Sequence, residues 1–102
     1  PNADTLKAIE ADLRAAGLTV ITIPSPGLIK DEDGGAIPAS HMNFLISNGH
    51  VFLPIYETKH SARAVAALAQ AMPGYNIIPL PARHILSGGG SFHCMTQQVP
   101  KV

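Results

Sequence analysis

The sequence predicts a mixed α/β fold with a sheet that contains both parallel and antiparallel strands. Three observations lead to this fold class: an apolar stripe with helical spacing near the start, two β-rich runs joined by Asn48-Gly49, and an alanine-rich run followed by a further β-rich run. Alternating helices and strands are typical of the α/β class. A hairpin is antiparallel, whereas a helical crossover joins parallel neighbours, so both pairings are expected.

The first 24 residues predict a helix followed by a strand. The helix rests on apolar residues spaced three or four apart, namely Leu6, Ile9, Leu13 and Ala16. Gly17 is placed to end it. The run "LTVITIP", residues 18–24, is rich in β-branched residues and predicts a strand. Residues 25–40, "SPGLIKDEDGGAIPAS", are too long for a simple turn and predict a mobile loop or an active-site lid.

The middle of the chain predicts a hairpin, a helix and a last strand. Residues 41–47 and 50–56 flank Asn48-Gly49, the pair favoured by type I′ turns because both of its residues accept positive φ. Residues 61–72, "SARAVAALAQAM", predict a helix that turns Val65, Leu68 and Met72 inward and ends before Pro73-Gly74. Residues 75–81, "YNIIPLP", predict the strand that follows it.

Charge and cysteine content narrow the function classes. The chain has 102 residues, the length of one domain or less. Its seven Lys and Arg residues balance its seven Asp and Glu residues, and it has no basic run. We therefore expect neither nucleic acid nor a membrane as a partner. A single cysteine excludes an internal disulfide framework and a thiolate-rich zinc site, and it fits the reducing cytoplasm. The chain opens at Pro1, which indicates a cut inside a larger protein; removal of an initiator Met is the alternative.

The segment 87–100, "SGGGSFHCMTQQVP", carries the candidate chemistry. Cys94 can attack a substrate only as a thiolate. The preceding glycines let backbone N–H groups approach a ligand, and a short helix starting at "MTQQ" would favour the thiolate. Thr96, Gln97 and Gln98 could hydrogen-bond the loop in place. The alternative is that Cys94 is a small buried hydrophobe. The interpretation of the glycines as a phosphate-binding loop has less support, because no Lys-Ser or Lys-Thr follows them. A metal site at His93 and Cys94 has less support still.

Two patterns resemble the agmatine deiminase and bacterial-type peptidylarginine deiminase family. The first is a triple-glycine run leading to His-Cys-x-Thr-Gln-Gln-x-Pro, matched by Gly88, Gly89, Gly90, His93, Cys94, Thr96, Gln97, Gln98 and Pro100. The second is an Ala-Ser-x-x-Asn-Phe hairpin, matched by Ala39, Ser40, Asn43, Phe44, Asn48, Gly49 and Pro54. The resemblance covers most of the chain in order.

The resemblance implies a pentein fold, a five-bladed α/β propeller of ββαβ-like units. The chain would be a carboxy-terminal fragment of a deiminase domain holding about one and a half units. Residues 1–24 would be the αβ tail of one blade, residues 40–81 a ββαβ unit, and residues 85–100 the Gly-rich loop with the nucleophile. We expect the remaining blades of the parent protein as partners, and self-association of the isolated chain into a homo-oligomer through apolar faces that those blades would cover.

The resemblance also implies hydrolysis of a small guanidine substrate, agmatine or arginine-like, with no cofactor and no metal. Cys94 would be the nucleophile, forming a covalent amidino-thioether, and Gly89 and Gly90 would contact the substrate. The proton-shuttling histidine and the carboxylates that hold the guanidinium come from earlier blades, so an isolated fragment should be inactive. After the hairpin the family commonly has Gly-Asp, where this chain reads "YETKHSAR", which leaves the substrate's other end open.

The remaining polar residues receive structural interpretations. None of the five histidines matches the family's catalytic histidine. An ordinary surface or strand-end role is favoured for His41, His50, His60 and His84, and a packing or orienting role for His93. On an extended backbone His93 should point away from Cys94. The acidic run 31–33 is interpreted as a solvated turn rather than a guanidinium clamp. A structural hydrogen bond explains Asn43. A non-enzymatic α/β binding module with a structural cysteine remains the alternative function.

Overall fold

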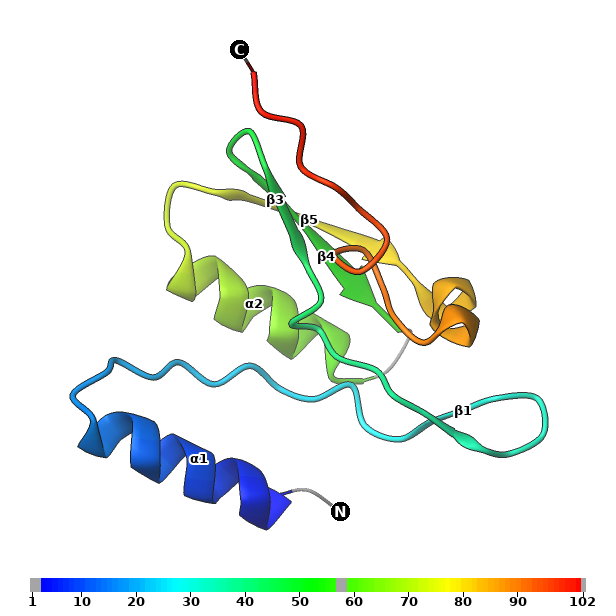
Figure 1. Cartoon of the computed structure of the whole chain (residues 1–102), viewed down its shortest axis with the longest axis horizontal. Coiled ribbons are helices and arrows are strands. Elements are labelled where there is room, and N and C mark those ends of the chain that lie inside the picture. Colours follow the sequence, from blue (N-terminus) through cyan, green and yellow to red (C-terminus); the bar gives the residue numbers. More distant parts are fainter. Residues whose placement is uncertain (1–2, 57–58, 102) are drawn as a thin grey trace.

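A three-stranded sheet with one helix against it forms the centre of the structure (Figure 1). The computed structural model describes residues 3–56 and 59–101. Strand β4, His50–Ile55, lies between β3, Leu45–Ser47, and β5, Asn76–Pro81. β3 runs antiparallel to β4, and β5 runs parallel to it. The predicted mixed sheet is confirmed.

The turn between β3 and β4 has the predicted chemistry. Asn48 adopts φ 50° and Gly49 adopts φ 81°, so both central residues are left-handed, as a type I′ turn requires. The turn sets the register that pairs Ser47 with His50 and continues along both strands. The hairpin brings residues 40–43, which precede β3, to the end of the sheet where β4 finishes.

Helix α2, Ser61–Ala71, connects β4 to β5 and covers one face of the sheet. Val51 and Leu53 lie two residues apart on β4, point to the same face and are fully buried against Leu68. Val65 and Met72 pack at the edge of this cluster, and Ala64 on the helix is fully buried. The helix and its inward residues are therefore confirmed, with its end at Ala71.

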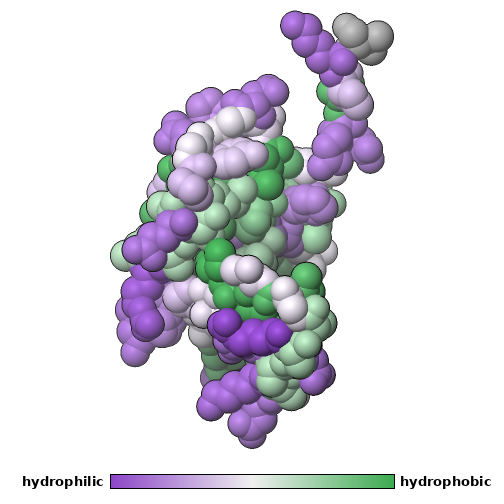
Figure 2. Space-filling view, turned by 90° about the vertical axis from the view of Figure 1, so that its left-hand side faces the viewer, coloured by the Kyte–Doolittle hydropathy of each residue, from purple (hydrophilic) through white to green (hydrophobic). Residues whose placement is uncertain are grey.

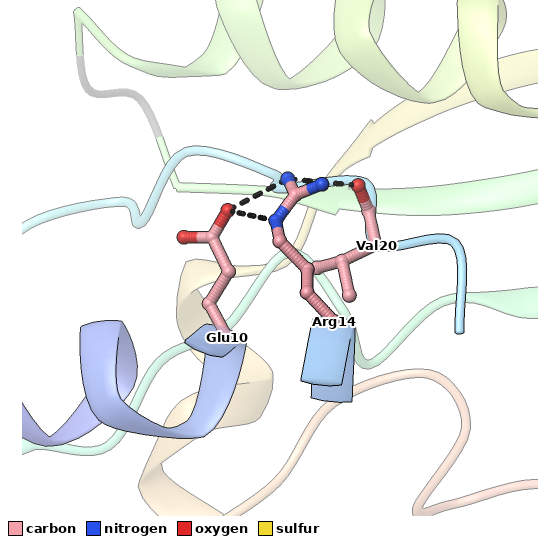
Figure 3. A network of polar contacts seen from close by, with 3 residues as sticks. All are labelled: Glu10, Arg14 and Val20. Atoms are coloured by element: carbon pink, nitrogen blue, oxygen red, sulfur yellow. Dashed lines mark hydrogen bonds and ion pairs between the residues drawn. The ribbon is translucent and has the colours of Figure 1, made fainter. Parts of the chain in front are cut away.

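Helix α1, Ala3–Ala15, is confirmed as an element, but its apolar stripe is exposed. Leu6, Ile9 and Leu13 keep 59%, 47% and 39% of their surface in contact with solvent. Arg14 pairs with Glu10 at 2.8 Å and also donates to the carbonyl oxygen of Val20 at 3.4 Å (Figure 3). These contacts hold the turn that leads from α1 into the next segment.

The predicted strand over residues 18–24 is absent from the structure. This segment is extended and runs between α1 and α2 (Figure 1), but no strand among the described residues pairs with it. A strand exists only through hydrogen bonds to a neighbour, so β propensity alone does not make one. Ile23 packs against the core of the sheet, whereas Ile21 remains 55% exposed. In Figure 2 hydrophobic residues come to the surface across the middle of this side of the molecule.

The predicted loop over 25–40 contains a small hairpin. Strands β1, Ile29–Lys30, and β2, Ala36–Ile37, pair antiparallel. The carboxylate of Asp31 accepts hydrogen bonds from the backbone N–H groups of Asp33 at 3.0 Å and Gly35 at 2.7 Å, which closes the turn. Ile29 is buried, so this segment is anchored to the rest of the molecule.

A second core cluster lies beside the sheet and supports the carboxy-terminal segment. It joins Ile29, Tyr56 and Ala82 to Leu86 of the 3₁₀-helix η1, Arg83–Gly88. No sequence pattern predicted η1, which ends on Gly89 in the left-handed region at φ 87°. Among the described residues, no helix has the length and apolar character needed to cross a bilayer.

Candidate active site

Cys94 lies in a turn that places its thiol at the surface. Residues 92–95 form this turn, in which the N–H of Met95 donates to the carbonyl oxygen of Ser91 at 3.2 Å. Thr96 closes it by donating its N–H and its hydroxyl to the carbonyl oxygen of His93, at 3.3 and 3.1 Å. Cys94 is exposed. The interpretation of Cys94 as a small buried hydrophobe is therefore wrong.

Other expectations for this segment need correction. No helix follows Cys94 in the described part of the chain, so a helix dipole does not act on the thiol. His93 lies in a turn rather than on an extended backbone. Thr96 holds the loop as expected, whereas Gln97 and Gln98 are exposed in the tail that leads away from the body in Figure 1.

Asn43 holds Cys94 at two points. Its Nδ2 donates to Cys94 Sγ at 2.9 Å, and its Oδ1 accepts the backbone N–H of Cys94 at 3.1 Å. The backbone N–H can pair only with the oxygen of the amide, so this bond fixes which end of the side chain faces the sulfur. The carbonyl oxygen of Asn43 also accepts the N–H of His93 at 3.3 Å. Sequence reasoning gave Asn43 only a structural hydrogen bond; its place in the hairpin pattern was the available signal.

The contact with Asn43 changes the acidity of the thiol. The hydrogen bond from the Asn43 amide lowers the pKa of Cys94 below its ordinary value, and the backbone at Ser91 lowers it further. Slight desolvation opposes both effects on this pKa. A donor that points at sulfur stabilises the thiolate more than the thiol, which is the physical cause of the shift. The turn therefore holds a thiol suited to nucleophilic attack.

Gly89 and Gly90, the predicted substrate-binding residues, line one hollow with Cys94, and Gly90 lies directly beside it. A Cβ on Gly90 would lie 2.8 Å from the Cβ of Cys94 and 3.1 Å from its Sγ, so only glycine lets the turn approach this closely. Both glycines line a hollow of about 210 Å³ that Cys94 and Met95 share, and a second hollow of about 310 Å³ that Asn43 shares. Their contact with a substrate stays a prediction.

A buried polar layer supports this site. Tyr56 is 1% exposed, and its hydroxyl donates to the carbonyl oxygen of Ser40 at 3.1 Å. Its ring stacks on His41 with centroids 5.7 Å apart. His41 is itself 1% exposed, and its Nδ1 pairs with the carbonyl oxygen of Pro24 at 2.7 Å. The expected surface or strand-end role of His41 is therefore wrong: it joins the extended segment to the base of the hairpin.

Among the described residues, no acid–base side chain contacts the Cys94 thiol. Within 3–56 and 59–101, no histidine or carboxylate hydrogen-bonds to Cys94 Sγ, and no three His, Cys, Asp or Glu side chains are grouped to hold a metal ion. The acidic run 31–33 lines a separate hollow of about 490 Å³ with Lys30 and Arg83. Of the divergent stretch after the hairpin, residues 57 and 58 lie outside the described residues.

Comparison with known proteins connects this geometry to one group. The model of the Porphyromonas-type peptidyl-arginine deiminase family matches residues 1–100. A Vibrio parahaemolyticus protein named "Putative agmatine deiminase" is 52% identical over 67 residues, which cover 66% of this chain and 19% of that protein.

Solved structures show the same relationship. The agmatine deiminase of C. jejuni matches with a TM-score of 0.80 and 28% identity, over 87% of this chain and 27% of that chain. A second C. jejuni structure, of a variant in which one cysteine is replaced by serine and substrate is bound, matches with a TM-score of 0.79 and 27% identity, over 86% and 26%. These neighbours agree with the expected piece of a pentein-type propeller.

The matches cover most of this chain but only a part of each relative's length. The chain spans about a fifth to a third of the length of the curated relatives it matches. The family match extends over both the hairpin that carries Asn43 and the turn that carries Cys94. This chain therefore belongs to the Porphyromonas-type peptidyl-arginine deiminase family.

Proposed function

We propose that this chain is the carboxy-terminal, nucleophile-bearing part of a cysteine-dependent guanidine deiminase. The observation that carries the proposal is the two-point contact between Asn43 and Cys94, which presents an exposed sulfur of lowered pKa. The substrate-bound C. jejuni structure supports it, because in that protein a cysteine was replaced by serine. Residues 1–24 are then the tail of one blade, 40–81 a ββαβ unit and 85–100 the loop with the nucleophile.

The first half of the reaction forms a covalent intermediate. The thiolate of Cys94 attacks the central carbon of a guanidinium group, and a C–S bond forms. The departing nitrogen takes up a proton, its C–N bond breaks, and ammonia leaves an amidino-thioether on the sulfur. A guanidinium carbon is a weak electrophile because resonance spreads its charge, so the nucleophile must already be ionised. The hydrogen bond from Asn43 and the positive charge of the substrate both favour that ionised form.

The second half returns the enzyme to its starting state. Water loses a proton to a general base and attacks the amidino carbon, the C–S bond breaks, and a ureido product leaves. Cys94 is regenerated as a thiolate that Asn43 again stabilises. The general base, a histidine, and the carboxylates that hold the guanidinium would come from parts of the parent protein outside this chain. Agmatine and peptidyl-arginine are the two substrate classes to test.

Replacement of the nucleophile in the full-length parent protein tests the proposal. Cys94→Ser should lower the formation of ureido product and ammonia by at least about a thousandfold, because the hydroxyl is a far weaker nucleophile than the thiolate. Brief incubation of the unaltered protein with substrate should add the mass of the substrate minus one ammonia to the peptide that carries Cys94. Full turnover in Cys94→Ser, or an adduct on another residue, would place the nucleophile elsewhere.

A further inference from the structure

Tyr56 occupies an unusual place relative to the site. It is the residue that follows β4, and its side chain is buried in the second core cluster with Ile29 and Leu86. A phenol is rarely this deeply buried unless its hydroxyl has a partner. Here the hydroxyl donates to the carbonyl oxygen of Ser40, three residues before Asn43. The phenol therefore acts on the short segment that carries the donor to the nucleophile.

The carbonyl oxygen of Ser40 is shared by two donors. It accepts the Tyr56 hydroxyl at 3.1 Å and the backbone N–H of Asn43 at 3.3 Å. The hydroxyl of Ser40 accepts the N–H of Met42 at 3.0 Å, so the whole turn from 40 to 43 is closed by hydrogen bonds. The turn fixes the Cα–Cβ direction of Asn43, and that direction decides whether its amide reaches the sulfur.

Tyr56 also borders a hollow next to the cysteine turn, one that Asn43 lines and Cys94 does not. Its side chain and those of Asn43 and Ser91 line the same hollow of about 310 Å³. Burial raises the pKa of Tyr56, and the negative charge of Cys94 raises it further, whereas its contacts with Ser91 and Ser40 oppose the rise. The phenol consequently stays protonated wherever the thiolate forms, and remains a donor. Within the described part of the chain, the other titratable side chain in contact with it is His41, stacked on its ring.

We propose that Tyr56 is a positioning residue for the nucleophile, acting on Cys94 through the carbonyl of Ser40 and the amide of Asn43. It does not touch the sulfur; it holds the turn that aims the Asn43 donor. This inference rests on the proposed function, in which the thiolate of Cys94 attacks the substrate. It predicts that removal of the buried Tyr56 hydroxyl, which is distant from Cys94 in the sequence, reduces the ionisation of the Cys94 thiol.

The test compares tyrosine variants in the full-length parent protein. Tyr56→Phe keeps the ring in the core and deletes only the hydroxyl donor. The rate at which Cys94 is alkylated at neutral pH should fall about fivefold, the loss expected for one net hydrogen bond. The pH midpoint of the alkylation rate should rise. In turnover, kcat should fall while KM changes little. Tyr75→Phe is the matched control, because it deletes the same atom from the exposed second tyrosine of the chain and should leave the midpoint unchanged.

A double variant separates positioning from general stabilisation. If Tyr56 acts through Asn43, then Tyr56→Phe combined with Asn43→Ala should alkylate no more slowly than Asn43→Ala alone. Additive losses, or slower turnover with an unchanged alkylation midpoint, would overturn the proposal. Inactivity of every variant and of the unaltered protein toward guanidines, with the alkylation pattern intact, would instead contradict the proposed function and leave the role of Tyr56 standing.

A measurement on the unaltered protein covers the case in which Tyr56→Phe does not fold. In an NMR pH titration of protein labelled with carbon-13 at tyrosine Cζ, the chemical shift of one tyrosine should change with the same pH midpoint as the alkylation of Cys94. The reason is that ionisation of the thiol acts on the Tyr56 phenol. That titration should disappear in Cys94→Ser. If no tyrosine resonance follows the thiol, the proposed coupling does not exist.

Discussion

Asn43 and Cys94 are 51 positions apart in the sequence, yet the Asn43 amide contributes to both the place and the acidity of the sulfur. Sequence reasoning singled out Cys94 as the candidate nucleophile, because a lone cysteine after three glycines within a family pattern is a local signal. It did not locate the donor. An asparagine at the start of a strand has several ordinary uses, and only the fold shows that its side chain reaches the cysteine turn.

The close approach of Gly90 to Cys94 gives a prediction at the residue scale. Gly90→Ala places a methyl group 2.8 Å from the Cβ of Cys94, so the turn must shift, and overpacking of this kind costs about 1–3 kcal/mol. The shift moves Sγ from Asn43, and we expect alkylation at neutral pH and turnover each to fall at least about tenfold. Both are measured in the full-length protein.

Gly88→Ala is the matched control for this variant. A Cβ at Gly88 meets no atom within 4 Å, and Gly88 has no positive φ, so the alanine fits without strain. Alkylation and turnover should stay close to those of the unaltered protein. Equal losses in the two variants would mean that flexibility of the glycine run, rather than the space at Gly90, matters for the sulfur.

At the scale of the elements, local signals predicted local structure. The hairpin, α2 and β5 are marked by the Asn48-Gly49 pair, the helical spacing and the Pro73-Gly74 stop, each contained within a few residues. The structure departs from expectation where long-range partners decide. Residues 18–24 have strand propensity, but no strand among the described residues pairs with them. β1 and β2 are a different case, because they join through a local turn that the Asp31 carboxylate closes onto Asp33 and Gly35. Helix η1 has no sequence periodicity that would reveal so short an element.

The turn between β3 and β4 supports a prediction of stability. Gly49 has φ 81°, and a Cβ there would meet no atom within 4 Å, so the cost of Gly49→Ala is conformational alone. A residue with a Cβ pays about 1–2 kcal/mol in the left-handed region. We expect Gly49→Ala to have a lower midpoint temperature of unfolding, measured by circular dichroism. The pH midpoint of Cys94 alkylation in the folded variant should stay close to that of the unaltered protein. No change in unfolding would mean that the turn relaxes to another type.

At the scale of the whole molecule, the apolar stripe of α1 has no cover within the described chain. Leu6, Ile9 and Leu13 are exposed along one side of the helix, and Leu18 and Ile21 continue the apolar surface into the next segment. Exposed apolar surface of this extent is typical of a face that meets another part of a protein. We therefore expect the isolated 102-residue chain to self-associate through it.

Gel filtration of the isolated chain over a range of concentrations measures this association. Ile9→Lys should shift the elution toward the monomer, because a charged side chain in the stripe cannot be buried without a partner. Ala8→Lys adds the same charge to the same helix outside the stripe and should leave the elution unchanged. A monomer at every concentration in the unaltered chain would contradict the prediction.

The distance along the chain between Asn43 and Cys94 also has a consequence in time. A ribosome makes the asparagine first, and Cys94 is the fifty-first residue added after it. β5 and η1 lie between the two along the chain, and in the folded structure they place the cysteine turn beside the hairpin. Until the two meet, the thiol keeps its ordinary acidity and reacts slowly. The reactivity of Cys94 should therefore report whether its contact with Asn43 has formed.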